Sequence, residues 1–382
     1  MIAVNTDLVD FSSDTPSSVT IGRTVDMGEL ITIGNAERCG GMYVVGEPRT
    51  GKSNMLTSLA LEDIHHGHSL LFIDPHTDAI NDLLARIPQK QLQNVILLDL
   101  TNKTHSFGIN LLRCSDPTDL VELDNVCGRA KDIFAKIWGD EQGRLGLWLE
   151  KILSNSIYLL LENPGYTLVE IPLLLSEDTR VRNSLLKNVK ANPYVKEFWY
   201  YEFDRLSKQD RTKQVDPALS RLNIFRRNTI IRHIVGQQKT TIDFYEILNR
   251  GNAQKIVLLR MPIQLASEVK SLLGTMILSE MLYAAFDRDK ILKKDRRYFA
   301  LYCDEFHNFA TPDFAKLFTQ TGKFYVMPTV AHQERLGQLK PEDPNFSATS
   351  AAPIKIFFRL SVHDSSELAP VVAKPPPLQR QN

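Results

Sequence analysis

The residues near the amino terminus that are best suited to chemistry form one continuous segment, Gly46-Glu47-Pro48-Arg49-Thr50-Gly51-Lys52-Ser53. The segment matches the phosphate-binding loop pattern, in which a glycine and four free positions precede Gly-Lys-Ser. The glycines permit a tight turn in which successive backbone N–H groups point at a nucleotide phosphate. The pattern assigns Lys52 to the β- and γ-phosphate oxygens and the Ser53 hydroxyl to Mg²⁺.

The flanking sequence favours this interpretation over an ordinary Gly/Ser turn. The apolar run Met42–Val45 precedes the loop, and apolar residues at helical spacing follow it from Ser53 to His65. A helix that begins there would aim the positive end of its dipole at the bound anion. We expect nucleotide contacts from the loop and the residue after it, namely Gly46, Glu47, Pro48, Arg49, Thr50, Gly51, Lys52, Ser53 and Asn54.

A pair of acids follows another apolar run much later in the chain. Tyr298–Cys303 predicts a buried strand, and Asp304 and Glu305 come directly after it. In a parallel sheet the carboxyl end of such a strand lies beside the phosphate loop. We expect Asp304 to hold Mg²⁺ through water, and Glu305 to orient and deprotonate the water that attacks the γ-phosphate. The alternative is an acidic, solvated strand end.

Gln333 occupies the corresponding position after the next predicted strand, Val326–Ala331. Its side-chain amide could contact the γ-phosphate or the attacking water. The alternative is an ordinary loop glutamine.

Three further groups have both a functional and a structural interpretation. Asp74, His76 and Asp78 could hold a metal, but a strand-to-helix turn explains them better because no second cluster accompanies them. Cys303 lies inside a predicted buried strand and is better interpreted as core than as nucleophile. The aromatic run 198–201 could stack on nucleic-acid bases, although such runs more often pack between helices.

Strand-like and helix-like segments alternate through most of the chain. The predicted strands are Met42–Val45, Ser69–Asp74, Val95–Asp99, Lys255–Arg260, Tyr298–Glu305, Val326–Ala331 and Ile354–Leu360. Helices are predicted at 53–65, 77–87, 265–289 and 314–318. This alternation implies right-handed crossovers and an α/β fold with a mainly parallel sheet covered on both faces.

Residues 116–238 break the alternation, because helical periods dominate there and strand signals are scarce. From Arg180 to Lys239 this segment holds fourteen Lys and Arg against five Asp and Glu, a net charge of about +9 in a chain of net charge zero. A basic, all-helical insertion suggests an acidic partner such as a DNA backbone. A solvated lysine-rich helical face is an equally good interpretation.

Length and composition are those of an ordinary globular protein. The chain has 382 residues, 43% hydrophobic and 24% charged, enough for a large core and two domains. Its four cysteines form no Cys-x-x-Cys pair, which argues against a zinc site or a disulfide framework. No secretion signal is visible in residues 1–14, and the apolar stretch 272–286 is too short to cross a bilayer. We therefore expect a cytoplasmic protein with no transmembrane segment.

Taken together, these motifs resemble the HerA–FtsK superfamily of ring-forming ATPases, and within it the TraG/TraD-type coupling ATPases of conjugative transfer and type IV secretion. The resemblance covers about residues 38–368. Its carriers are Gly46–Ser53, Ile73–Asp78 with Leu83–Pro88, Gly108–Leu112, Leu272–Gly274, Cys303–Phe309, Ala331–Gln333 with Gly337–Leu339, and Phe358–Leu360.

The resemblance implies a RecA-like P-loop core with an all-helical insertion, which hydrolyses Mg-ATP in a hexameric ring and moves DNA through that ring. The strand type of that DNA is left open. Lys52, Glu305 and Gln333 would be catalytic, and Ser53 and Asp304 would hold Mg²⁺. Candidate partners are a membrane secretion complex or a relaxosome-type protein, which would place the protein at the inner face of the membrane.

The expected domains follow from the same resemblance. Residues 1–36 form a peripheral segment with one short strand at Leu30–Ile33, and residues 37–115 form the first part of the RecA-like core. The all-helical insertion spans 116–238, the second part of the core spans 239–369, and an extended proline-rich tail spans 370–382.

The chain departs from the family pattern in three places. Thr77 replaces the usual glycine after Asp-Pro-His. Gly322-Lys323 replaces an Arg-Lys pair that is a candidate arginine finger, and lysine cannot reproduce a bidentate guanidinium contact. The membrane helices with which coupling proteins usually begin are not seen.

Three other functions share these motifs. A HerA-like helicase or anti-phage NTPase would use the same chemistry with a nuclease partner. A protein-secretion ATPase would not respond to DNA, and a nucleotide-binding scaffold would show little turnover.

Overall fold

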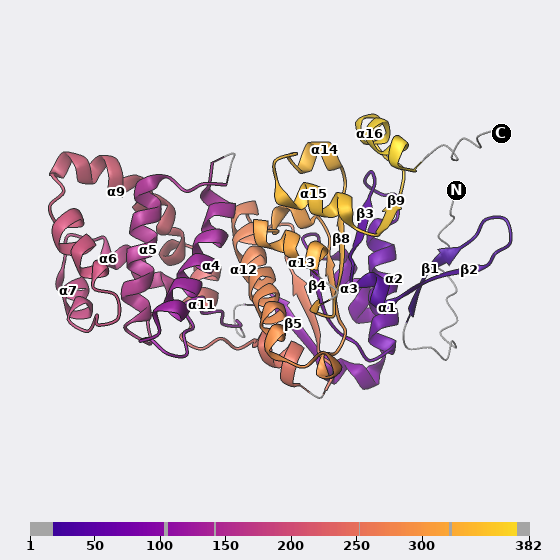
Figure 1. Cartoon of the computed structure of the whole chain (residues 1–382), viewed down its shortest axis with the longest axis horizontal. Coiled ribbons are helices and arrows are strands. Elements are labelled where there is room, and N and C mark those ends of the chain that lie inside the picture. The colour runs from indigo at the N-terminus through magenta and orange to yellow at the C-terminus, as the bar shows by residue number, and fades with distance from the viewer. Residues whose placement is uncertain (1–17, 103–105, 141–142, 252, 321–322, 373–382) are drawn as a thin grey trace, which may run out of the picture. The chain divides into compact units, whose positions relative to one another are not determined.

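The computed structural model describes residues 18–102, 106–140, 143–251, 253–320 and 323–372, and Figure 1 shows the chain. The described residues form two compact units. The sheet unit comprises those up to Leu97, residues Tyr245–Arg260 and those from Ala284 onward. The helical unit comprises Leu98–Phe244 and Met261–Tyr283.

The sheet unit is built on a seven-stranded sheet in the order β5-β6-β4-β7-β8-β3-β9. The pairings from β6 to β9 are all parallel, as expected for strands joined by crossover helices. The strands are β3 (Met42–Val45), β4 (Ser69–Asp74), β5 (Val95–Asp99), β6 (Ile256–Arg260), β7 (Phe299–Cys303), β8 (Val326–His332) and β9 (Ile354–Phe357). The predicted α/β fold with a mainly parallel sheet is confirmed.

The helices of the sheet unit lie between these strands in sequence, except that α1 precedes β3 and α16 follows β9. They are α1 (Asn35–Arg38), α2 (Lys52–His65), α3 (Asp78–Arg86), α13 (Ala315–Gln320), α14 (Arg335–Gln338), α15 (Pro344–Ala351) and α16 (Val362–Val372). Short helical turns are η1 (Gln89–Asn94), η4 (Glu246–Arg250), η5 (Asp287–Lys290), η6 (Lys293–Asp295), η7 (Phe306–Asn308) and η8 (Pro312–Phe314).

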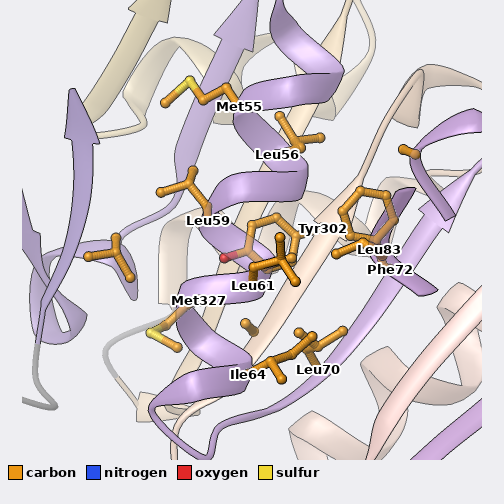
Figure 2. Close-up of a cluster of buried hydrophobic side chains, with 14 of the residues drawn as sticks. Met55, Leu56, Leu59, Leu61, Ile64, Leu70, Phe72, Leu83, Tyr302 and Met327 are labelled. Carbon is orange, nitrogen blue, oxygen red and sulfur yellow. The ribbon is translucent and has the colours of Figure 1, made fainter. Parts of the chain in front are cut away.

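The core of the sheet unit lies where α2 packs on the sheet. Figure 2 shows side chains of α2 (Met55, Leu56, Leu59, Leu61 and Ile64) beside Leu70 and Phe72 of β4, Leu83 of α3, Tyr302 of β7 and Met327 of β8. All ten are at most 2% exposed. Because each fully buried aliphatic or aromatic side chain contributes about 1.5–3 kcal/mol, this contact fixes α2 against the sheet.

The amino-terminal part of the sheet unit holds one element that the sequence did not predict. The predicted short strand is β2 (Leu30–Gly34), and it pairs antiparallel with β1 (Ser18–Arg23). The Thr20 backbone N–H donates to the Glu62 carboxylate of α2 at 2.9 Å, which ties the hairpin to that helix.

At the other end of the chain, α16 runs to Val372, so residues 370–372 are helical and not extended as predicted. Residues 373–382 of the predicted tail, and residues 1–17, lie outside the described part of the chain.

The helical unit is all-α. Its helices are α4 (Leu120–Trp138), α5 (Leu147–Leu161), α6 (Ile171–Leu174), α7 (Arg180–Leu186), α8 (Tyr194–Glu197), α9 (Lys208–Leu222), α10 (Ile224–Arg227), α11 (Thr229–Val235) and most of α12 (Ser267–Phe286), with the turns η2 (Leu168–Glu170) and η3 (Phe198–Phe203). The unit begins earlier than residue 116 because the segment around Gly108 is hydrogen-bonded to the end of the insertion. Ile109 N–H donates to the Ile234 carbonyl at 3.0 Å, and Gly108 N–H to Thr241 Oγ1 at 2.9 Å.

One helix of the described chain is long and apolar enough to span a membrane, over Ser267–Lys290. Of its most apolar window, 72% is buried inside the protein, as in the core helix of a folded domain. The expectation that the apolar stretch is too short was wrong, because the helix begins at Ser267 and α12 alone runs for 20 residues.

Candidate functional site: the carboxyl edge of the sheet

The strand register brings three loop starts together at one edge of the sheet. Val45 of β3 lies opposite His332 of β8 and opposite Phe357 of β9. On the next strand, Cys303 of β7 lies opposite Val330. The segments that follow these strands therefore begin at the same edge, where open parallel sheets bind ligands.

The phosphate-loop segment adopts a backbone that its glycines permit. Gly51 has a φ of 105° and Arg49 a φ of 62°, both in the left-handed region. A Cβ on Gly46 would lie 2.5 Å from Cβ of Phe358, so only glycine fits between the loop and the end of β9. Arg359, the next residue, holds Glu47 of the loop by two contacts. Its carbonyl accepts from Glu47 N–H at 2.7 Å, and its guanidinium contacts the Glu47 carboxylate at 2.6 Å.

Backbone donors at the start of α2 are available to an anion. The N–H groups of Gly51, Lys52 and Ser53 take part in no hydrogen bond with a residue that the structure describes. The helix then continues with Met55 N–H donating to the Gly51 carbonyl at 3.0 Å. Uncommitted N–H groups at the positive end of a helix are suited to a phosphate.

The Lys52 side chain lies inside the loop and is only 6% exposed. Its ammonium donates to the carbonyls of Gly46 at 2.5 Å and Glu47 at 3.0 Å. Burial lowers the pKa of Lys52, and the nearby carboxylates of Asp304 and Glu305 oppose that shift. A cation is thus held among two carboxylates and the free N–H groups of the loop.

The loop and the acidic pair meet at Ser53 and Asp304. The Ser53 hydroxyl donates to Asp304 Oδ2 at 2.8 Å, although the two residues are 251 positions apart. A hydroxyl and a carboxylate are hard oxygen ligands of the kind that Mg²⁺ prefers. The donor set therefore fits this ion, and Ser53 and Asp304 are the residues that would hold it.

Glu305 is 6% exposed and has a φ of 48°, a backbone conformation that is rare outside glycine. Burial and then the charge of Asp304 raise its pKa. Such a carboxylate is a stronger base than a solvated one, which suits proton abstraction. Strained, buried residues of this kind concentrate at functional sites.

Two glutamines after β8 converge on the Glu305 carboxylate. The side-chain amide of Gln338 donates to Glu305 Oε2 at 3.3 Å, and its carbonyl oxygen accepts from the backbone N–H of Gln333 at 3.0 Å and of Glu334 at 3.1 Å. The Gln333 side chain also interacts with Glu305 and opposes the rise in its pKa. Sequence reasoning gave Gln338 no role. Its position five residues after Gln333, on a short helix, was the available signal.

A buried polar network supports this segment from behind. Arg335 is 2% exposed, and its guanidinium donates to the Phe346 carbonyl at 2.9 Å and to Thr349 Oγ1 at 3.2 Å in α15. Asp364 of α16 accepts from Arg335 N–H at 2.7 Å and so caps α14. The chain just after Gln333 is therefore anchored to two helices.

His332 lies buried beside this segment. It is 0% exposed, and its Nε2 is hydrogen-bonded to the Tyr43 hydroxyl. Burial lowers the pKa of His332 to about 3, so the ring is neutral at physiological pH.

The Asp74 cluster is structural, as the sequence favoured. Asp74 is 2% exposed and accepts from the N–H groups of His76 at 2.8 Å and Ala79 at 3.0 Å, which caps the start of α3. Among the described residues, no group of three or more His, Cys, Asp and Glu side chains is arranged to hold a metal ion. Thr77 has a φ of 70°, which explains why glycine is the easier residue at this turn.

The remaining sequence-based interpretations concern Cys303, the aromatic run and Gly322-Lys323. Cys303 is fully buried and burial raises its pKa, which fits core packing. In the aromatic run, Phe198 and Trp199 are buried, whereas Tyr200 and Tyr201 are exposed. Gly322 lies outside the described residues. Lys323 is described, and its carbonyl accepts from the Arg296 guanidinium.

Comparison with known proteins identifies the fold. The sequence matches no protein-family model and no curated protein. VirB4 of Thermoanaerobacter pseudethanolicus is similar in structure, with a TM-score of 0.59 and 15% identity over 95% of this chain and 90% of that one. The bacterial conjugative coupling protein TrwBΔN70, in its trigonal form with sulphate, gives a TM-score of 0.60 and 13% identity over 92% and 77%.

TrwB in complex with ADP and Mg²⁺ is also similar, with a TM-score of 0.54 and 13% identity over 86% of this chain and 71% of that one. The chain therefore has the fold of these P-loop ATPases. The predicted RecA-like core with a helical insertion is confirmed, and so, at the level of fold, is the resemblance to conjugative coupling ATPases.

Proposed function

We propose that the protein hydrolyses Mg-ATP at the carboxyl edge of its sheet, and uses the energy to move DNA in a conjugation or type IV secretion process. The observation that carries the proposal is the contact of Ser53 with Asp304 beside Lys52 and Glu305. The fold shared with VirB4 and TrwB, and the ADP and Mg²⁺ in one TrwB complex, support it.

In this proposal the residues have separate tasks. The N–H groups of residues 51–53 and the Lys52 ammonium bind the phosphates, and Ser53 and Asp304 hold Mg²⁺, which neutralises charge on the phosphate oxygens when bound. Glu305 takes the proton of the attacking water. Gln333 contacts the γ-phosphate or that water.

We assign Gln338 as a positioning residue for the same reaction. Its side-chain amide is hydrogen-bonded both to the carboxylate of Glu305 and to the backbone N–H of Gln333. These bonds hold the base and the segment that contacts the γ-phosphate in a fixed relative position. This role acts through Glu305 and Gln333, and does not require contact with ATP.

The DNA substrate, the ring and the partners are the further parts of the proposal. Ring assembly would place a second copy beside the γ-phosphate, and the finger arginine would then come from a position other than Lys323. A secretion complex or a relaxosome-type protein would bring the ring to the membrane.

The test is ATP turnover of the full chain with and without DNA, together with its particle mass in the presence of a slowly hydrolysed ATP analogue. The proposal predicts Mg²⁺-dependent turnover that DNA stimulates, and a mass of several chains. Turnover that DNA leaves unchanged would favour the protein-secretion alternative. Nucleotide binding without turnover would favour the scaffold.

A further inference from the structure

The basic segment of the helical unit contains cations that are already engaged within it. Arg180 pairs with Asp178 at 2.6 Å. Arg182 is fully buried, forms an ion pair with Asp204 and lies 5.1 Å from the Trp199 ring centroid. These arginines have partners in the fold and are poorly placed to bind an external anion.

Three arginines on α9 and α10 differ from these. The guanidinium groups of Arg221, Arg226 and Arg227 form no hydrogen bond, ion pair or ring contact with any residue in the described ranges. All three are exposed. Their positive charge is therefore not neutralised within the helical unit.

Two of them lie around one pocket. Arg226 and Arg227 line an open pocket of about 570 Å³ together with Arg232 of α11. The Arg232 guanidinium donates to the Arg226 carbonyl at 3.1 Å, which holds it at the turn between the two helices. Three guanidinium groups thus gather over a short stretch of chain.

The acid among the lining residues does not cancel this charge. Three arginines and one acid, Glu170, line the pocket, so its side chains carry a net charge of about +2. The Glu170 carboxylate accepts from Thr167 N–H at 2.7 Å and Thr167 Oγ1 at 2.9 Å, which holds it in the cap of η2. The rest of the wall includes the apolar side chains of Val169 and Leu173. A pocket lined by both guanidinium groups and apolar side chains suits a phosphate that carries a sugar or a base.

A second pocket adjoins this one. Arg227 also lines a second open pocket of about 480 Å³, whose wall includes Asn102, Asn228, Thr229 and His233 and one acid, Asp99. The Asp99 carboxylate accepts from Thr101 N–H at 2.9 Å and Thr101 Oγ1 at 2.6 Å. Two adjoining pockets that share one arginine can accept a linear chain of anions more readily than a single anion. Neutral polar side chains in the second pocket offer hydrogen bonds to sugar or base groups.

From these observations we propose that the Arg226–Arg227–Arg232 pocket and its neighbour bind the phosphate backbone of a nucleic acid. The proposal rests on the proposed function, since it locates a contact for the DNA that the ATPase would move. Phosphate contacts of this kind give affinity and salt dependence without reading sequence.

The test compares two double variants of the full chain, with fluorescein-labelled duplex and single-stranded DNA as probes. Arg226→Ala/Arg227→Ala removes two charges from the pocket, and Lys208→Ala/Lys213→Ala removes two charges from exposed positions on α9 that line neither pocket. Binding is followed by fluorescence anisotropy between about 50 and 200 mM salt. Circular dichroism melting confirms that each variant is folded.

We expect the arginine variant to bind DNA roughly tenfold more weakly than wild type, and its slope of log affinity against log salt to fall by about two. The control, Lys208→Ala/Lys213→Ala, should keep the wild-type slope. Arg226→Lys/Arg227→Lys restores the slope but not all of the affinity, because lysine keeps the charge and loses the planar fork.

Two results would overturn the inference separately from the proposed function. In one, wild type binds DNA and DNA stimulates its ATP turnover, but the arginine variant has the wild-type slope. In the other, the arginine variant binds labelled polyglutamate more weakly than wild type but binds DNA as tightly as wild type does. That result would assign the pocket to an acidic protein segment. Wild-type protein that neither binds DNA nor responds to it in turnover would overturn both.

Discussion

The two ends of α2 carry polar clusters of similar composition and opposite character. Each combines a cation, at least one carboxylate and a hydroxyl drawn from segments far apart in the chain. At the last turn, Asp63 of α2 meets Arg38 of α1 and Tyr302 of β7, and all three are 0% exposed. At the first turn, Lys52 and Ser53 lie with Asp304 at the sheet edge.

In the cluster at the last turn, both oxygens of the Asp63 carboxylate are paired by the other members, although Arg38 Nε is buried without a hydrogen-bond partner in the described part of the chain. The Arg38 guanidinium donates to both carboxylate oxygens of Asp63, at 2.8 and 2.7 Å, and to the Tyr302 hydroxyl at 2.8 Å. That hydroxyl donates to Asp63 Oδ2 at 2.5 Å. Burial alone would raise the pKa of Asp63, but the charge and hydrogen bonds of Arg38 outweigh it and hold the pKa below its usual range.

The cation of the cluster at the first turn is not paired in this way. Lys52 donates to backbone carbonyls, although two carboxylates are near, and the loop N–H groups have no partner among the described residues. Burial and the adjacent Asp304 raise the pKa of Glu305. The difference indicates that one end of α2 holds the fold together, whereas the other keeps its donors and acceptors for a ligand.

The largest expected effect is a loss of ATP turnover when the cluster at the first turn of α2 is changed. Lys52→Ala should lower ATP turnover at least 10³-fold, about 4 kcal/mol, because it removes the cation that contacts the transferred phosphate. Its unfolding free energy should change little. A variant that unfolds instead would show that Lys52 is structural, like Arg38.

The reciprocal change acts on stability. Asp63→Asn should lower the unfolding free energy by about 3 kcal/mol, measured by urea denaturation, because it leaves the buried Arg38 without a counter-charge. Turnover per folded molecule should stay at the wild-type value. A loss of turnover in folded Asp63→Asn protein would break the distinction between the two ends.

A smaller effect tests the positioning role of Gln338. Gln338→Ala should lower kcat roughly tenfold, about 1.4 kcal/mol, and leave KM for ATP unchanged, because the amide orients the base without touching ATP. Asn308→Ala is the matched control, since its amide donates to the backbone carbonyl of the same residue, Glu305, at 3.1 Å. Equal kcat values for Gln338→Ala and Asn308→Ala would show that Gln338 does not position the base.

The smallest effect is a pH dependence of stability from Asp63. A carboxyl whose pKa is lower in the folded state stabilises the protein above its unfolded pKa, near 3.9, and loses that contribution as the pH falls through the folded pKa. Wild type should therefore lose stability in acid more steeply than Asp63→Asn. Parallel stability curves for the two proteins below pH 4 would contradict the assigned direction.

The site was more predictable from sequence than the support around it. Local spacing identifies the loop from Gly46 to Ser53, and parallel strands that end at one edge bring Asp304 and Gln333 to it. The Arg38–Asp63–Tyr302 network carries no such signal, since Tyr302 is 239 positions from Asp63 and belongs to no motif. Only the packing of α2 on the sheet reveals it.

The domain boundaries were less accessible for a similar reason. Periodicity predicts that residues 265–289 are helical, but not that residues 261–283 fold with the helical unit. Likewise, segment 106–112 has no helical period, and hydrogen bonds to residues 234–241 attach it to that unit. Long-range pairing of this kind depends on the folded structure and leaves no local pattern.

The central claim is that the loop and the acidic pair act on one triphosphate, with Glu305 as the base. The most direct measurement is the identity of the nucleotide recovered from protein mixed with Mg-ATP at less than one equivalent. Wild type should release ADP and phosphate, whereas Glu305→Gln should retain intact ATP, because the amide cannot accept the proton. Release of ADP from Glu305→Gln at the wild-type rate would contradict the account.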